Sequence, residues 1–239
     1  MTPIMTADTV RNFANTNEHR LTAAPKGIVL DFFGLGFNRM RNEDDIPAVP
    51  FAEKNILYVF PYNNPWNWMN PQAISYTDEL LSVLAAKYHL PDDYPLVTCG
   101  GSMGGHSTLT YARYASHTPV RAVANCPVCD LPYHYTERPD LPRTLYSAYF
   151  HEEGNIEDVL ARFSPYHLAE KNEMPDISYV IFHCTKDEKV NKEKHSDRFV
   201  AELEKHGRNV EYIAVPDRGH TDLPPEYWEK FWDSVLAVF

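Results

Sequence analysis

Short apolar runs of strand length recur along the chain, separated by longer segments of mixed polarity. These runs lie at residues 27–32, 55–60, 96–99, 120–125, 177–184 and 210–215. Some of the segments between these runs have the spacing of a helix. In one of them Asn70 is a potential N-cap and Pro71 the first helical residue, and the apolar residues Ile74, Leu81 and Leu84 fall on one face. Strands that alternate with helices predict an α/β fold, in which helices cover both faces of a mainly parallel sheet.

Two further helices are predicted in the carboxyl-terminal part of the chain. Asn191 is a suitable N-cap for a helix that ends at Gly207. A final helix begins at Pro225, and its apolar residues from Trp228 to Leu236 recur at helical spacing. We expect this last helix to bury those residues, Trp228 included.

Two regions lack a clear period. Residues 1–25 are rich in Asn and Thr and predict an irregular arm or one added edge strand. Residues 127–165 contain prolines interleaved with aromatic residues, which indicates a small cap, partly helical around 141–150, inserted over the sheet. An α/β chain of 239 residues commonly forms one domain, so we predict a single domain over 1–239.

A sharp turn between a strand and a helix is the first candidate for chemistry. The run 96–99 leads into Gly100-Gly101-Ser102-Met103-Gly104, and a helix-length segment follows. In this context Gly-x-Ser-x-Gly holds a serine at the apex of a strained turn, where the glycines leave room because they carry no Cβ. Ser102 is therefore the candidate nucleophile. The N–H of Met103, at the start of the helix, is a candidate oxyanion donor.

Two other polar residues also follow predicted strands. Asp187 comes after the run 177–184, and His220 comes after the run 210–215. The carboxyl ends of parallel strands share one sheet edge, and the chain order Ser, Asp, His is that of the α/β-hydrolase fold. His220 would act as the general base, and Asp187 would orient its imidazole. Asp130 is an alternative acid, whereas His106, inside the helix after Ser102, is expected to pack.

The loop after the first run contains Gly34-Leu35-Gly36. A dinucleotide fingerprint would need a third glycine at position 39, where the chain has Arg39, and a helix, which the charged, proline-containing segment 43–50 does not predict. The alternative is an oxyanion loop, whose backbone N–H groups approach a tetrahedral intermediate. We expect Leu35 to supply this second donor, with its neighbours Gly34 and Gly36 as the alternatives.

The charge and composition of the chain exclude some classes of binding partner. The chain has 22 Lys and Arg against 33 Asp and Glu, a net charge of −11, which argues against binding to nucleic acid or an anionic membrane. No stretch approaches the roughly 18 apolar residues of a membrane span, and the first 30 residues lack a signal pattern. We therefore expect a cytoplasmic protein, and an oligomer is compatible with this sequence.

The four cysteines are expected to be reduced, buried thiols. Cys126 and Cys129 have the spacing of a redox or zinc pair, but a redox pair normally opens a helix, and Pro132 argues against a helix there. We therefore predict no metal and no organic cofactor.

Several blocks together resemble the catalytic domain of prolyl-oligopeptidase-type serine hydrolases. They are the motif 100–105, Ser164-Pro165, the segment 183–190 and the segment 216–220, and the resemblance covers about residues 27–239. It implies an α/β-hydrolase fold with Ser102, Asp187 and His220 as nucleophile, acid and base.

Two departures from that family shift the expected substrate. The 26 residues before the first strand are too few for the amino-terminal propeller that filters substrates in the family's peptidases. Where its prolyl peptidases use a Tyr hydroxyl at the oxyanion, this chain has Phe33, which has no donor. We therefore predict hydrolysis of small-molecule carboxylic esters through an acyl-Ser102 intermediate, with Phe33, Trp66 and Trp68 lining the substrate site. A peptidase or aminopeptidase acting on short peptides and a non-catalytic ligand-binding protein are the alternatives.

Overall fold

A seven-stranded sheet forms the centre of the molecule. The computed structural model describes residues 4–37 and 48–239. The strands are β1 (Ala14–Thr16), β2 (Ile28–Phe32), β3 (Leu57–Pro61), β4 (Leu96–Gly101), β5 (Arg121–Asn125), β6 (Ser178–Cys184) and β7 (Asn209–Val215). They lie in the order β1-β3-β2-β4-β5-β6-β7, and every pair is parallel except β1 with β3. The predicted α/β fold is confirmed, and the amino-terminal arm supplies the edge strand β1.

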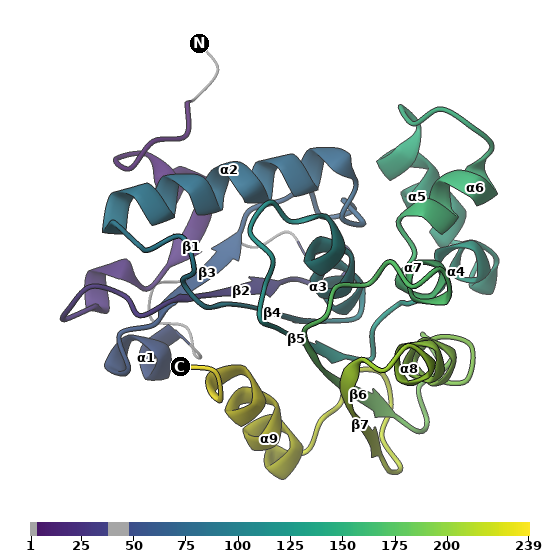
Figure 1. The fold of residues 1–239 in the computed structure, drawn as a ribbon. Helices are drawn as coiled ribbons and strands as arrows, with labels where there is room; N and C mark the ends of the chain where they lie inside the picture. Colours follow the sequence, from purple (N-terminus) through teal and green to yellow (C-terminus); the bar gives the residue numbers. More distant parts are fainter. Residues whose placement is uncertain (1–3, 38–47) are drawn as a thin grey trace.

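Helices cover both faces of this sheet (Figure 1). They are α1 (Ala48–Glu53), α2 (Pro71–Tyr88), α3 (Met103–Tyr114), α4 (Leu131–Glu137), α5 (Leu141–Tyr149), α6 (Ile156–Arg162), α7 (Pro165–Glu170), α8 (Ser196–Lys205) and α9 (Pro225–Leu236). Side chains of α2, α3 and α8 pack against one face, and those of α1 and α9 pack against the other.

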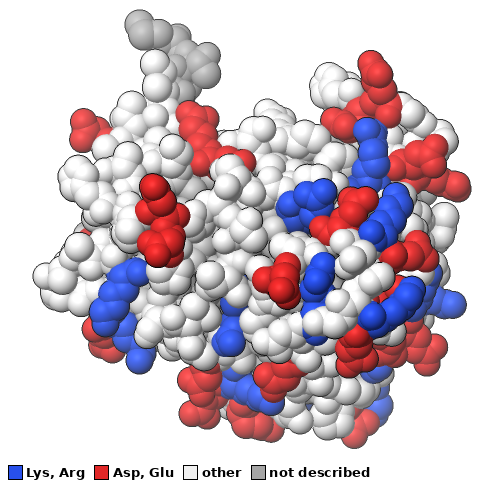
Figure 2. All heavy atoms as spheres, in the orientation of Figure 1, with Lys and Arg blue, Asp and Glu red and all other residues white. Residues whose placement is uncertain are grey.

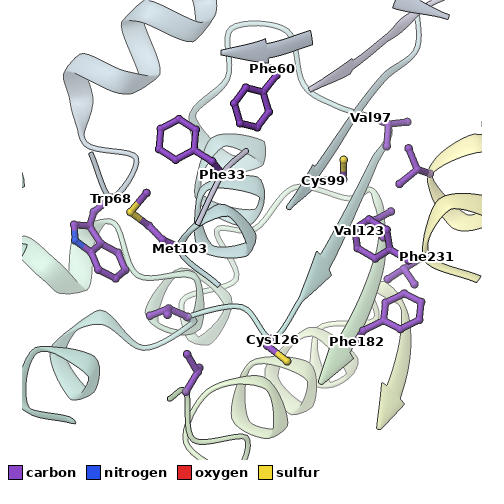
Figure 3. Close-up of a cluster of buried hydrophobic side chains, with 14 of the residues drawn as sticks. Phe33, Phe60, Trp68, Val97, Cys99, Met103, Val123, Cys126, Phe182 and Phe231 are labelled. Carbon is purple, nitrogen blue, oxygen red and sulfur yellow. The ribbon is translucent and has the colours of Figure 1, made fainter. Parts of the chain in front are cut away.

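The core continues from under the sheet to its carboxyl edge. Figure 3 shows one cluster of buried side chains that includes Val97, Val123 and Phe231 near α9 and reaches Trp68 and Met103 at the other end. This cluster contains residues of the sheet and of the loops beyond its carboxyl edge. These loops are therefore held in place by close packing against the core.

Helix starts follow the expected capping chemistry at some places and not at others. Asn70 caps α2 as predicted, its Oδ1 accepting the N–H of Ala73 at 2.9 Å. The helix expected from Asn191 begins only at Ser196. Asn191 instead caps a separate turn, because its Oδ1 accepts the N–H of Lys194 at 3.0 Å.

Prolines misled the prediction at two other helices. α4 begins at Leu131, so the expectation that Pro132 prevents a helix was wrong: Pro132 lies in the first turn, where a missing N–H breaks no hydrogen bond. Pro50 lies in the first turn of the short helix α1, although no helix was predicted there. The predicted loop residues Asn38 and Arg39 and the segment 43–47 lie outside the described residues.

The region 127–165, predicted as a cap, contains α4, α5 and α6 beside the sheet (Figure 1). The helix expected near 141–150 is α5. All four cysteines are buried and free. In the described part of the chain, no helix has both the length and the apolar character that crossing a membrane requires. Figure 2 shows acidic and basic side chains interspersed over one face of the molecule.

Candidate active site

The turn at Ser102 has the strained backbone that its sequence predicts. Ser102 has φ +59° and ψ −123°, a conformation that costs about 1–3 kcal/mol. Its neighbours have no room for a side chain: a Cβ on Gly100 would lie 2.6 Å from the carbonyl oxygen of Phe32, and a Cβ on Gly104 only 2.1 Å from it. The N–H of Ser102 donates to the carbonyl oxygen of Asn125 at 2.9 Å. This bond fixes the turn to the end of β5.

Three side chains from three loops meet beside this turn. Nε2 of His220 lies 2.8 Å from Oγ of Ser102, and Nδ1 of His220 lies 2.7 Å from Oδ2 of Asp187. Ser102 and His220 are 118 positions apart in the sequence, and the parallel strands β4 and β7 bring them to the same edge. In this arrangement the imidazole is within reach of the hydroxyl proton, and the carboxylate fixes Nδ1–H as a donor.

Donors hold both carboxylate oxygens of Asp187. Its side chain is fully buried, and Oδ1 accepts the N–H groups of Lys189 (2.8 Å) and Val190 (3.0 Å). Oδ2 faces His220 and also lies 3.4 Å from Nε2 of His183. Burial opposes ionisation, but the bonds from His183 and His220 outweigh it and hold the pKa of Asp187 well below its ordinary value. The side chain that faces His220 is therefore an ionised carboxylate.

Two backbone N–H groups near Ser102 are available to an oxyanion. Met103 is the first residue of α3, and in the described chain its N–H has no carbonyl partner. The loop after β2 lies against the turn, since the Cβ position of Gly34 is 3.9 Å from Cβ of Ser102. Within that loop the N–H of Leu35 is likewise unpaired among the described residues, whereas that of Gly36 donates to a carbonyl oxygen. The geometry thus leaves the two predicted donors, Met103 and Leu35, unpaired.

A cavity of about 590 Å³, here called the Ser102 cavity, opens at Ser102 and His220. Aromatic residues form a large part of its wall: Phe32, Phe33, Phe37, Trp68, Trp228, Phe231 and Trp232. Phe33 and Trp68, both expected at the substrate site, line it and are otherwise buried. Trp228 was expected to be buried, but it is 38% exposed, because α9 presents it to this cavity.

Trp66 lies in a neighbouring cleft instead. It is 48% exposed and lines a space of about 1050 Å³ between the loop after β3, the start of α2 and α5. Leu35 lines both spaces, so the cleft adjoins the Ser102 cavity. The three residues expected to contact substrate therefore divide: Phe33 and Trp68 border the candidate nucleophile, and Trp66 borders the cleft beside it.

The other residues considered from the sequence have different partners. Asp130 is the N-cap of α4 and pairs with Arg198, Oδ2 to Nη1 at 2.6 Å. His106 is fully buried on α3, with Nδ1 3.1 Å from the carbonyl oxygen of Val128 and Nε2 3.1 Å from that of Trp68. Asp130 and His106 are therefore both engaged with partners other than His220.

A cluster that the sequence analysis did not single out has the composition of a metal site. The donor atoms of His134, Glu137 and His195 lie within 4.8 Å of one another. However, Nδ1 of His195 accepts the backbone N–H groups of Cys129 and Asp130, each at 3.1 Å. The His195 proton therefore sits on Nε2, and that nitrogen has no lone pair for a metal. The three side chains fit a hydrogen-bond network rather than a metal centre.

A second group with metal-ligating side chains, Cys126, Asp187 and His220, shares its carboxylate and imidazole with the Ser102 site. Those two groups are already bonded to each other.

The family model described as the prolyl oligopeptidase family matches residues 77–237, which is more than half of the chain and includes Ser102, Asp187 and His220. No curated protein matches the sequence at a significant level.

Several solved structures share the fold at low sequence identity. Esterase B from Lactobacillus rhamnosis has a TM-score of 0.68 and 13% identity, with 91% of this chain and 76% of that chain covered. A puromycin-hydrolysing peptidase from Mycobacterium tuberculosis has a TM-score of 0.65 and 17% identity, with 83% of this chain and 31% of that chain covered. A thermophilic esterase from Thermogutta terrifontis has a TM-score of 0.60 and 19% identity, with coverages of 90% and 81%.

At these sequence identities the similarity to solved structures establishes only the fold, whereas the match to the family model shows the family. With its strand–turn–helix arrangement at Ser102, the chain has the α/β-hydrolase fold and belongs to the prolyl oligopeptidase family of serine hydrolases.

Proposed function

We propose that the protein hydrolyses carboxylic esters through an acyl-Ser102 intermediate. The observation that carries this proposal is the 2.8 Å contact between Nε2 of His220 and Oγ of Ser102, with Asp187 behind the imidazole. His220 takes the hydroxyl proton as Oγ attacks the ester carbonyl, then gives it to the departing alkoxide. Water, activated by His220, releases the acid. Such proton transfer is worth about 10²–10⁴-fold in rate.

The N–H groups of Met103 and Leu35 stabilise the oxyanion in this scheme. Both are unpaired in the described chain, and each such donor is worth about 3 kcal/mol of transition-state stabilisation. Every proton in the scheme moves between Ser102, His220, the substrate and water: His220 takes one from Ser102 and gives it to the alkoxide, then takes one from water and returns it to Ser102. The scheme therefore requires neither a metal nor an organic cofactor.

Phe33 supports esters over amides as substrates. It occupies the loop position next to the candidate oxyanion donors and carries no hydroxyl, so stabilisation of the oxyanion rests on backbone groups alone. An amide makes a larger demand, because its leaving nitrogen must also be protonated. Cleavage of short peptides is the second candidate, favoured by the match to the prolyl oligopeptidase family. The buried free thiols support a reducing compartment, for which we propose the cytoplasm.

Labelling with a fluorophosphonate probe tests whether the protein is a hydrolase at all. We expect one adduct, on Ser102, and none in Ser102→Ala. Equal labelling of both proteins, or no labelling of the wild type, would leave a non-catalytic ligand-binding protein as the better account.

Matched substrates test the kind of bond. We expect p-nitrophenyl esters of short acyl chains to be turned over faster than aminoacyl and prolyl p-nitroanilides, and Ser102→Ala to remove both activities. Faster cleavage of the anilides would make the protein a peptidase.

A further inference from the structure

A buried polar network lies beside the Ser102 cavity. Oε2 of Glu137 is 2.6 Å from Nδ1 of His134 and 3.1 Å from Nε2 of His195. Its other oxygen, Oε1, accepts the N–H of Asn191 at 2.8 Å. These contacts join α4 to the turn that precedes α8.

The network fixes where each proton sits. Because Nδ1 of His195 accepts two backbone N–H groups, His195 carries its proton on Nε2 and donates it to Glu137. Burial opposes the charge on Glu137, but the bonds from the two histidines lower its pKa to about 2, so it is an acceptor. His134 therefore donates through Nδ1, and burial keeps it neutral by lowering its pKa to about 4. This leaves Nε2 of His134 as an acceptor.

His134 is one of the residues that line the Ser102 cavity. It is 2% exposed, with its ring edge-on to Trp68 at 5.4 Å between centroids. Among the described residues Nε2 has no protein partner, yet it is not among the unpaired atoms that are closed off from solvent. Nε2 is therefore an acceptor that keeps some contact with solvent, on a side chain that lines the same cavity as Ser102. The neighbouring Arg138 guanidinium is already engaged by both oxygens of Asp140.

We propose that Nε2 of His134 recognises the substrate by accepting a hydrogen bond from its hydroxyl or N–H group. This proposal rests on the proposed ester hydrolysis and names its substrate class: esters that carry such a donor close to the scissile carbonyl. Aromatic side chains form a large part of the surrounding wall, and a fixed acceptor beside them orients the ligand. An analogue without the donor leaves a buried acceptor unpaired, which predicts a discrimination of roughly 10- to 100-fold in kcat/KM.

Two pairs of p-nitrophenyl esters differ only in the donor. The N-acetylglycine and 4-oxopentanoate esters differ by N–H against CH₂, and the 3-hydroxybutanoate and 3-methylbutanoate esters differ by hydroxyl against methyl. For each pair we take the ratio of kcat/KM with the donor to kcat/KM without it. Comparing this ratio between wild type and variants cancels the intrinsic reactivity of the esters.

Two variants test the role of the acceptor. His134→Asn removes the ring, and Glu137→Leu keeps the ring but removes the acceptor of its Nδ1–H, which frees the proton to move to Nε2. In at least one pair we expect both variants to lower the ratio by roughly 10- to 100-fold, while the ester without the donor changes less than about threefold. His89→Asn, on an exposed histidine at the end of α2, is the matched control and keeps the wild-type ratio.

The outcomes separate this proposal from the proposed function. An unchanged ratio in both pairs for His134→Asn or Glu137→Leu, in protein that still labels at Ser102, overturns the role of His134 and leaves ester hydrolysis standing. An equal loss for both members of each pair means a structural role and also overturns it. A wild type that neither labels nor cleaves any of the four esters overturns both proposals.

Discussion

Nε2 of His183 lies 3.4 Å from Oδ2 of Asp187, the same oxygen that faces His220. His183 is fully buried. Its Nε2 is also 3.1 Å from the carbonyl oxygen of Val190, so this nitrogen carries the proton, and the hydroxyl of Ser196 donates to Nδ1 at 2.7 Å. Asp187 thus has a fixed donor in His183, in addition to its contact with His220.

Removing that donor is expected to weaken both the fold and turnover. In His183→Phe, Asp187 loses a charge-assisted contact, and we expect a loss of about 1.5–3 kcal/mol in unfolding free energy. We also expect kcat to fall more than KM changes, because the carboxylate orients His220. Ser196→Ala keeps the imidazole and is expected to cost about 1 kcal/mol. Urea unfolding and ester kinetics measure these effects, and an unaltered kcat in His183→Phe would contradict the positioning role.

Asp187→Asn is expected to fold and to lose roughly 10⁴-fold in kcat, because the neutral amide no longer fixes the required tautomer of His220. Steady-state kinetics with a p-nitrophenyl ester measure the loss. Asp130→Asn is the matched control, since Asp130 pairs with Arg198 instead, and we expect it to keep turnover within a few fold. The reverse result would transfer the role of acid to Asp130.

Gly104→Ala is expected to be severely destabilising. The added Cβ would lie 2.1 Å from the carbonyl oxygen of Phe32 and 2.9 Å from that of Phe33, and backbone atoms of a central strand cannot move away cheaply. We expect a loss of about 3 kcal/mol or more, or no folded protein. Gly219→Ala is the control, because a Cβ there meets nothing within 4 Å. Chemical denaturation measures the unfolding free energy of the two variants, and equal values would refute the steric argument.

Acid is expected to destabilise the protein well above the range in which carboxylates titrate. Burial lowers the pKa of His106 and of His134 to about 4, whereas unfolded histidines titrate near 6.5. Below pH 6.5 the unfolded chain binds protons that the folded chain does not. The contribution of these two neutral histidines to the unfolding free energy is therefore fully present above about pH 6.5. It is lost as the pH falls toward 4, by up to about 1.4 kcal/mol per pH unit for each histidine.

Urea unfolding at pH 7.5, 6 and 5 measures this dependence. His134→Asn removes one of the two groups, so its stability should change less between pH 7.5 and 5 than that of the wild type. A wild-type stability that does not fall over this interval would contradict the buried, neutral state of these histidines.

The strands and the loops after them were predictable because the central parallel strands are buried on both faces. β2, for example, is buried at every position from Ile28 to Phe32, which makes it a continuous apolar run in the sequence. The residues that follow such runs share one edge by topology alone. Ser102, Asp187 and His220 were predicted to lie together in this way, and the structure brings them within hydrogen-bond distance.

The His134–Glu137–His195 network could not be predicted in the same way. Glu137 and His195 are 58 positions apart, and their contact depends on how the proline-rich region 127–165 packs against the turn before α8. Trp228 shows the same limit, since helical spacing placed it correctly on α9 but did not show that its ring borders an open cavity. Local pattern determines an element, whereas tertiary packing determines what each of its side chains contacts.

Asn125 at the end of β5 contacts two of the loops that carry the candidate chemistry. Its carbonyl oxygen accepts the N–H of Ser102, and its side-chain Nδ2 donates to the carbonyl oxygen of Thr221, next to His220, at 3.3 Å. A displacement of this one strand end would therefore carry the hydroxyl and the imidazole along together. Thermal motion of the sheet edge would then shift the pair as a unit and keep Nε2 of His220 within hydrogen-bond distance of Oγ of Ser102.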